Sequence, residues 1–263
     1  MQNEQSSINE KAWNCSPYEA WLSRYGTPAE AAERIKADPL ARLSGLYEHL
    51  GSVEGRKAVN LLGSHGSKAV ALALLGAQVT VVDIASENAR YAGELAEAAG
   101  VSVRYLVSDV TQLPEEELDG SYDMAFMEFG ILHYFTDLTP LMNTVYRLLH
   151  PGGRLVLQDF HPFTTKLISS KGTRHTTRKH KVTGDYFDEG LTEVEVPYLK
   201  FLPEDKQEDL PKTLLRRWTL GEIVTSCAQA GLVIRLLLEE PNKSSDVYDK
   251  GIPKTFTLVA DRP

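Results

Sequence analysis

The chain has 263 residues, of which 42% are hydrophobic, and carries a formal net charge of −8 at pH 7. This length suits one α/β domain with additional segments, and the composition supports a full hydrophobic core. The acidic charge argues against a nucleic-acid partner, because contacts to phosphates require clustered Lys and Arg.

Targeting, membrane and metal signals are not expected either. The first residues lack the basic start and apolar run of a secretory signal. No window reaches the ~18 apolar residues that a membrane-spanning helix needs. Cys15 and Cys227 lie far apart in the sequence and lack metal-ligand spacing. We therefore expect a cytoplasmic protein with no metal site and no membrane partner, and we leave its oligomeric state open.

The N-terminal segment is predicted to be helical and rich in aromatic residues. It contains Trp13, Tyr18, Trp21 and Tyr25, and the spacing of the last three places them on one helix face. A helix packed on the domain would explain such a face.

From residue 57 onward the sequence alternates apolar strands with helices. Helices are predicted over 67–75, over 86–99 with Ser86 as the cap, and from Asp137 to a break at Pro151-Gly-Gly153. This alternation predicts a doubly wound parallel sheet, whose ligands bind beyond the carboxyl ends of the strands. The strands of this part are predicted over 57–62, 78–83, 101–107, 124–128 and 154–159.

The last third of the chain follows a different pattern. Residues 161–213 have no clear period and are predicted to be an insertion with one strand at 192–198. Its basic stretch, 171–181, is explained by a solvated loop or by a lid over an anionic substrate. A short strand at 214–218 precedes a helix that a Thr219–Glu222 capping box starts. Two strands, 233–238 and 255–260, should pair antiparallel, because no helical pattern fits between them.

The most informative motif is the turn that follows the first strand, Asn60-Leu-Leu-Gly63-Ser-His-Gly66. Asp83 ends the second strand seventeen residues after Gly66. This spacing is typical of a nucleotide-binding βαβ unit, in which the turn approaches a ligand and the acid accepts both hydroxyls of a ribose. Leu62 and Ser64 stand where the usual fingerprints carry glycine. Asp109 and Glu128 fall at two further strand ends, so the three acids should converge at one edge of the sheet.

These elements resemble the class I S-adenosylmethionine-dependent methyltransferases over about residues 46–261. The terminal antiparallel pair is a hallmark of that superfamily and separates it from dehydrogenases. The resemblance implies a Rossmann-like, mostly parallel seven-stranded α/β sheet with an antiparallel terminal strand. The matching motifs are the turn 60–66, Asp83, Ser108-Asp109-Val110, Tyr122-Asp123 leading to Glu128, Gly130, Leu132 and His133, and Leu149-His-Pro-Gly-Gly153-Arg-Leu-Val.

The resemblance also implies a site for S-adenosylmethionine. Asp83 would bind the ribose, Asp109 and the Val110 N–H would read the adenine, and the turn would approach the methionine head. The alternatives are a helix cap at Asp83, an Asx turn at Asp109 and a solvent-facing acid at Glu128. The residues expected to bind the cofactor are Asn60, Gly63, Ser64, Gly66, Asp83, Ile84, Asp109, Val110 and Glu128.

Methyl transfer is an in-line displacement, so the protein mainly aligns the reactants and excludes water. A general base is needed only where the acceptor loses a proton. The candidates lie where the acceptor should bind. His133 follows the fourth strand, His161 follows the fifth strand, and Tyr186 lies in the insertion. Structural roles are the alternative for each: packing at a helix start for His133, packing beside the following proline for His161, and anchoring of the insertion for Tyr186.

The resemblance divides the chain into four parts. These are an N-terminal helical lid (1–45), a cofactor-binding α/β core (46–160), a substrate-side insertion (161–213) and a C-terminal completion of the core sheet (214–263). The leading hypothesis is an enzyme that methylates O, N or C of a small molecule. A non-catalytic domain that binds cofactor or product is the alternative. A nicotinamide-dependent oxidoreductase shares Asp83 but leaves Asp109 and the terminal strand pair unexplained.

Overall fold

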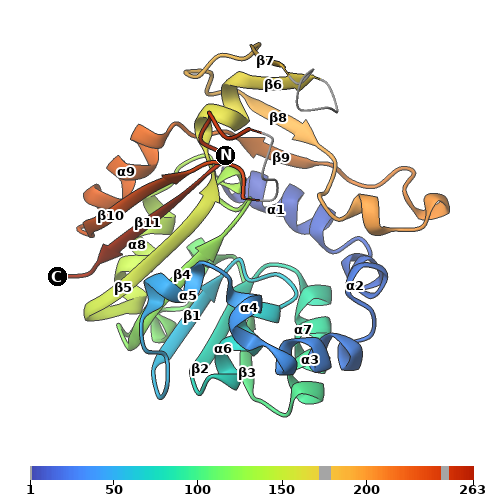
Figure 1. Ribbon diagram of the computed structural model, residues 1–263, viewed down its shortest axis with the longest axis vertical. Helices are drawn as coiled ribbons and strands as arrows, with labels where there is room; N and C mark the ends of the chain where they lie inside the picture. Colours follow the sequence, from blue (N-terminus) through green and yellow to red (C-terminus); the bar gives the residue numbers. More distant parts are fainter. Residues whose placement is uncertain (1, 172–178, 244–248) are drawn as a thin grey trace.

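The computed structural model describes residues 2–171, 179–243 and 249–263, and it is built around one large mixed sheet (Figure 1). The strands of this sheet are β1 (Lys57–Leu61), β2 (Gln78–Asp83), β3 (Val103–Val107), β4 (Tyr122–Glu128), β5 (Leu149–Phe160), β10 (Val233–Glu240) and β11 (Thr255–Asp261). Their order is β10-β11-β5-β4-β1-β2-β3. β1 to β5 run parallel, and β11 runs antiparallel to both β5 and β10. The predicted fold class is therefore confirmed.

Helices cover both faces of the sheet, and the side chains of each strand alternate between them. On β4, Met124 and Phe126 join the apolar cluster under α6 (Ser67–Leu74) and α7 (Ser86–Ala99). Ala125 and Met127 join the cluster under α8 (Thr139–Leu148) and α9 (Leu220–Gln229). Because both faces are buried, the strand ends are where the core can present polar groups to a ligand.

Several predicted helix boundaries are confirmed. α7 spans the predicted residues and ends where Gly100, at φ 74°, donates to the carbonyl groups of the last turn. The capping box of α9 forms between Thr219 and Glu222. Ser86, however, is the first residue of α7 and not its cap. Its backbone N–H is bound by the side chain of Asn14 at 2.9 Å, so the N-terminal segment supplies the cap.

The N-terminal segment is helical, as predicted. It forms α1 (Gln2–Trp13), α2 (Pro17–Tyr25), α3 (Pro28–Ala37), α4 (Pro39–Leu43) and α5 (Leu46–Leu50). α2 and α3 pack on α7, and α4 packs on α6. α1 lies at the end of the molecule where β5 finishes (Figure 1). Among the residues that the structure describes, no helix combines the length and apolarity needed to cross a bilayer.

The insertion contains more structure than predicted. It forms two hairpins, β6 (Ile168–Lys171) with β7 (Lys179–Val182), and β8 (Leu191–Val194) with β9 (Thr213–Arg216). The strand predicted at 192–198 is thus shorter than expected, and the one predicted at 214–218 pairs with β8 rather than with the large sheet. Most of the basic stretch, 172–178, lies outside the described residues. Figure 1 shows these hairpins at the end of the molecule where β5 finishes, with α1 below them.

The helix ends at Leu148, before Pro151-Gly-Gly153, but the predicted start of the fifth strand at Arg154 is wrong, because β5 already begins at Leu149 and runs through this segment. The C-terminal tail supplies the reason: Gly152 N–H donates to the carbonyl of Arg262, and Arg262 N–H donates to the carbonyl of Gly153, each over 2.8 Å. The glycines are absorbed as a register shift between β4 and β5.

Candidate active site

The acids and the turn predicted to bind the cofactor lie along one edge of the sheet, at the carboxyl ends of its parallel strands, and Asp159 joins them there. In sheet order, Asp109 follows β3, Asp83 ends β2, the turn 62–66 follows β1, Glu128 ends β4 and Asp159 lies near the end of β5. Neighbouring strands are about 4.8 Å apart. The edge therefore offers a row of polar groups to an extended ligand.

The turn after β1 is held in an unusual backbone conformation. Leu62 has φ 52° and Ser64 has φ 49°, so both occupy the left-handed region that favours glycine. Gly63 is required for space, since a Cβ there would lie 2.5 Å from Oδ1 of Asn60 and 2.7 Å from Val81. The positions at which fingerprints carry glycine thus keep the expected conformation. The steric cost is about 1–2 kcal/mol for each of the two side chains.

Asp83 is fixed by three donors within the protein. Its Oδ2 accepts from Ser64 N–H at 2.9 Å, and its Oδ1 accepts from Ala85 N–H at 3.0 Å and from Asn88 Nδ2 at 3.2 Å. Burial raises the pKa of Asp83, while these donors act in the opposite direction. A carboxylate accepts about four hydrogen bonds. One position on Oδ2 therefore remains for a ligand hydroxyl, where two had been predicted.

Asp109 adopts the predicted alternative, an Asx turn, with one of its oxygens. Its Oδ1 accepts from the backbone N–H and the hydroxyl of Thr111, both at 2.8 Å. Its Oδ2 has a weaker contact, with Gln112 at 3.4 Å. Val110 is buried and Ile84 is half-buried. The reading of an adenine by Asp109 remains a prediction, and Oδ2 is the atom available for it.

Lys68 was not foreseen as a site residue. It lies in the first turn of α6, and its ammonium group forms an ion pair with Glu128 at the end of β4. The side chains of Lys68 and Glu128 are 20% and 11% exposed, so Glu128 is not a solvent-facing acid. Burial raises the pKa of Glu128, and the Lys68 charge opposes this. No local pattern in the sequence indicates the pair, because the contact depends on β1 and β4 being neighbours.

The aromatic residues of α2 cover the turn after β1. The rings of Trp21 and Tyr25 lie 4.9 Å and 4.7 Å from the ring of His65, and burial lowers the pKa of His65 to about 3. Trp21 also donates to Asn88 at 2.8 Å, and Asn88 binds Asp83. Tyr18 donates to Glu94 of α7. α2 is thereby linked to the strand-end carboxylate.

Asp159 organises the loop after β4 and was not predicted as a site residue. Its Oδ1 accepts from Gly130 N–H at 2.6 Å, and its Oδ2 accepts from Leu132 N–H at 3.4 Å. The loop is tight, with Phe129 at φ 42° and Gly130 at φ 78°. Asp159 therefore fixes the backbone that presents His133.

His133 is the predicted catalytic residue with a free ring nitrogen. Its Nε2 is buried and has no hydrogen-bond partner among the residues that the structure describes. Burial lowers the pKa of His133 to about 4, so the ring is neutral near pH 7. The ring of Tyr134 lies 4.5 Å away, and Trp13 of α1 lies 6.0 Å from Tyr134. The ring is therefore available as an uncharged imidazole, and its lowered pKa makes it a weaker base than a free imidazole.

The other two candidates are engaged by the protein. His161 is buried, with Nε2 2.7 Å from Glu239 and with Nδ1 accepting from Phe163 N–H at 3.0 Å. Since Nδ1 accepts, the ring proton lies on Nε2 and faces Glu239. The Tyr186 hydroxyl accepts from Leu220 N–H at 3.1 Å and anchors the insertion to the start of α9. Their catalytic roles remain predictions that this geometry does not favour.

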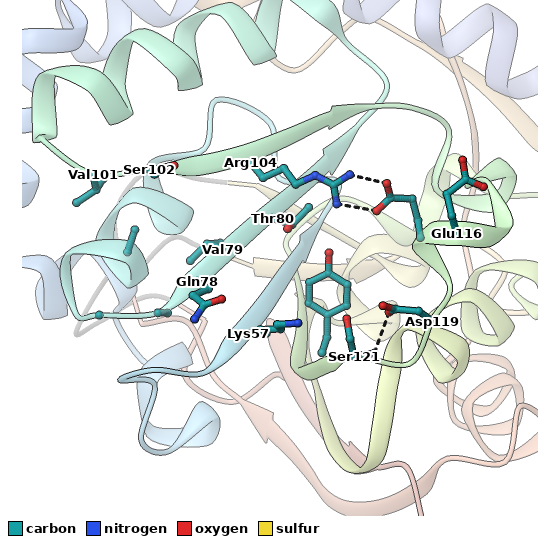
Figure 2. A pocket seen from close by; sticks show the side chains of 15 residues that line it. Lys57, Gln78, Val79, Thr80, Val101, Ser102, Arg104, Glu116, Asp119 and Ser121 are labelled. Carbon is teal, nitrogen blue, oxygen red and sulfur yellow. Dashed lines mark hydrogen bonds and ion pairs between the residues drawn. The ribbon is translucent and has the colours of Figure 1, made fainter.

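A cavity of about 740 Å³ lies at the opposite edge, beside the amino ends of β1 to β3 (Figure 2). Its lining includes Lys57, Gln78 and Asp119, and a bidentate ion pair joins Arg104 to Glu117 at 2.5 and 2.7 Å. The cavity contains none of the predicted site residues. Ligands of doubly wound sheets bind at the carboxyl edge, so we assign the site there.

Comparison with known proteins shows which kind of domain the chain contains. Residues 62–157 match a family described as a methyltransferase domain. The demethylmenaquinone methyltransferase of Thermus thermophilus is 39% identical over 87 residues, which cover 33% of this chain and 38% of that protein. The ubiquinone biosynthesis O-methyltransferase of Bordetella avium is 28% identical over 147 residues, which cover 56% of this chain and 60% of that protein. The chain thus spans less than two thirds of these relatives.

Solved structures share the fold over most of the chain. An S-adenosylmethionine-dependent methyltransferase from Mesorhizobium loti superposes with a TM-score of 0.64 at 22% identity, covering 86% of this chain and 99% of that one. The magnesium protoporphyrin IX methyltransferase of Synechocystis, solved with bound S-adenosylhomocysteine, gives a TM-score of 0.57 at 17% identity and covers 98% and 100%. The fold is that of the class I S-adenosylmethionine-dependent methyltransferases. Residues 62–157 therefore match a methyltransferase domain, and the fold around them is shared with these methyltransferase structures.

Proposed function

We propose that the protein is an S-adenosylmethionine-dependent methyltransferase acting on a small-molecule acceptor. The observation that carries the proposal is the row of groups at the carboxyl edge: Asp83, the turn after β1 and the Lys68–Glu128 pair follow one another on β2, β1 and β4. The relatives' names and the matching domain support the same reaction class. A cytoplasmic location, predicted from the sequence, is part of this proposal.

The residues present fit the chemical parts of this cofactor. The free position on Oδ2 of Asp83 suits a ribose hydroxyl, and Oδ2 of Asp109 suits the adenine amine. The turn, whose backbone conformation is kept at Leu62 and Ser64, lies between these acids and Glu128. Charges of both signs at Lys68 and Glu128 suit an amino-acid head. The donor and acceptor set therefore matches a nucleoside joined to a zwitterion.

The bound cofactor supplies an electrophilic methyl group, and the chain's residues align the acceptor and exclude water. His133 would accept the acceptor's proton at Nε2, because this atom has no hydrogen-bond partner among the described residues. Asp159 would hold the loop that positions the ring. We therefore favour an acceptor that loses a proton, such as a hydroxyl, among the O, N and C acceptors that the sequence left open.

One observation favours the non-catalytic alternative. Leu62 and Ser64 place side chains where the fingerprint has glycine, and their bulk limits how closely a ligand can approach the turn. A domain that only senses the cofactor or its product would tolerate this better than an enzyme. The two functions differ in one respect that can be measured, the transfer of the methyl group.

The test is a transfer assay with S-adenosylmethionine that carries a tritium-labelled methyl group. The purified protein is incubated with fractionated small-molecule extracts, and label is sought in new products. Labelled product with the parent and at least a hundredfold less with His133→Ala, at equal cofactor binding, would support the proposal. Cofactor binding without any labelled product across the fractions would favour the sensor.

A further inference from the structure

The Lys68–Glu128 ion pair occupies a place where the fold does not require it. Lys68 begins α6 and Glu128 ends β4, so the pair joins two elements on either side of the turn that leaves β1. β1 and β4 already pair through their backbones, and α6 packs through apolar residues such as Val70 and Leu72. A largely buried ion pair adds little net stability, because the desolvation of both charges offsets their attraction.

The pair lies at a suitable distance from the nucleoside end of the proposed site. Asp83 ends β2 and Glu128 ends β4, with β1 between them. Two strand spacings amount to about 10 Å. A ligand whose ribose binds Asp83 can therefore reach the pair with a short aliphatic arm. Arg42 adds a third charge nearby, since its guanidinium binds Ser67 and opposes the raised pKa of Glu128.

We propose that Lys68 and Glu128 neutralise each other until the amino-acid head of the cofactor separates them and pairs with both. Lys68 takes the carboxylate and Glu128 takes the ammonium group, so each buried charge exchanges one partner of opposite sign for another. This inference rests on the proposed function, because it assumes that S-adenosylmethionine is the ligand.

The exchange has a consequence for specificity. A ligand with a single head charge separates the pair and leaves one of its members unpaired, which is costly in a buried site. A ligand with no head leaves the pair closed and gains nothing from it. The pair therefore selects ligands that carry both charges.

The selection for both head charges is tested with two proteins and two charged ligands, and a third ligand without a head serves as the control. The parent and Lys68→Met are titrated by calorimetry with S-adenosylmethionine and with decarboxylated S-adenosylmethionine, which keeps the ammonium group but lacks the carboxylate. We expect the parent to prefer the intact cofactor by about tenfold or more, as for a hydrogen bond between charged groups. Lys68→Met should lose this preference. 5′-Methylthioadenosine, which has no head, should bind both proteins equally.

Two further variants keep the test decisive. Glu128→Gln preserves the shape of the side chain and should weaken both ligands that carry an ammonium group, but not 5′-methylthioadenosine. Lys206→Met breaks the exposed pair of Lys206 with Glu19, 2.6 Å apart, and should change none of the affinities. Melting temperatures show whether each variant is folded.

The outcomes separate the inference from the function on which it rests. One contradicting outcome is that Lys68→Met and Glu128→Gln weaken all three ligands by the same factor, and another is that they change no affinity. In either case the cofactor binds but the exchange of partners does not occur. If the parent binds none of the three, both the proposed function and the inference are contradicted.

Discussion

The backbone N–H of Ser64 donates to Oδ2 of Asp83 over 2.9 Å, which ties the turn after β1 to the end of β2. Ser64 reaches this acceptor with φ at 49°, a conformation that costs a side chain about 1–2 kcal/mol. The backbone geometry of a glycine-rich turn is therefore preserved without glycine at this position. The strain at Ser64 should lower the free energy of unfolding, and a substitution at this position can measure it.

Ser64→Gly should stabilise the folded protein. Glycine removes the steric cost at φ 49° and adds roughly 0.5–1 kcal/mol of backbone entropy to the unfolded chain, so we expect a net gain of about 0.5 kcal/mol. Ser64→Ala keeps the strain and serves as the control. Urea denaturation measures the free energy of unfolding for each, and a Ser64→Gly protein no more stable than Ser64→Ala would show that the turn is unstrained.

Gly63→Ala should do the opposite at the neighbouring position. The added Cβ would lie 2.5 Å from Oδ1 of Asn60 and 2.7 Å from Val81, so the turn or these two side chains must shift. Overpacking of this kind costs about 1–3 kcal/mol. The same denaturation experiment applies, and an unchanged midpoint would mean that the turn has room that the structure does not show.

The large sheet could be predicted because its signals are local. The acid that ends β2 and the glycine that follows α7 mark the ends of these elements in the sequence itself. The hairpins of the insertion could not be predicted in the same way, since β8 and β9 are short and lie far apart along the chain.

The same distinction between local signals and tertiary contacts holds for the candidate site. Asp83 was found from its spacing, but the donors that occupy most of its acceptor positions come partly from the turn and from Asn88, and they appear only in the folded structure. The role of Asp159 depends on the contact between β4 and β5, and the engagement of His161 by Glu239 depends on β10. Tertiary contacts between strands distant in sequence carry this information.

His133→Ala and His161→Ala should separate a catalytic from a structural histidine. If His133 is the general base, its removal lowers the rate of methyl transfer by about 10²–10⁴-fold with little effect on cofactor affinity. His161→Ala should reduce stability, because Phe163 N–H loses its acceptor, and leave the rate within a fewfold of the parent. Single-turnover kinetics with a saturating acceptor measures the transfer rate of both variants. A larger rate loss for His161→Ala than for His133→Ala would reverse the assignment.

His65 should make the stability of the protein depend on pH. Burial, and then the charge of Arg42, lower its folded-state pKa from 6.5 to about 3. Between these values the unfolded chain binds a proton here that the folded chain does not, so the free energy of unfolding falls as the pH falls. The slope is about 1.4 kcal/mol per pH unit.

His65→Phe keeps an aromatic ring between Trp21 and Tyr25 and removes the titration. We expect the stability of this variant relative to the parent to increase steadily as the pH is lowered from 6.5 to 4. The raised pKa values of Asp83, Glu128 and Asp159 act in the opposite direction but are common to both proteins. A difference that stays constant with pH, in urea denaturation at each pH, would place His65 in water.

The central claim is that S-adenosylmethionine binds at the carboxyl edge of the sheet through Asp83. Calorimetric titration of the parent, Asp83→Ala and Asp119→Ala with this cofactor tests it most directly, because Asp119 lines the cavity at the opposite edge. Loss of a hydrogen bond to a charged group is worth about 1.5–3 kcal/mol, so Asp83→Ala should bind tenfold or more weakly. We expect this loss together with parental affinity for a folded Asp119→Ala protein. Unchanged affinity in a folded Asp83→Ala protein, or a loss confined to Asp119→Ala, would contradict it.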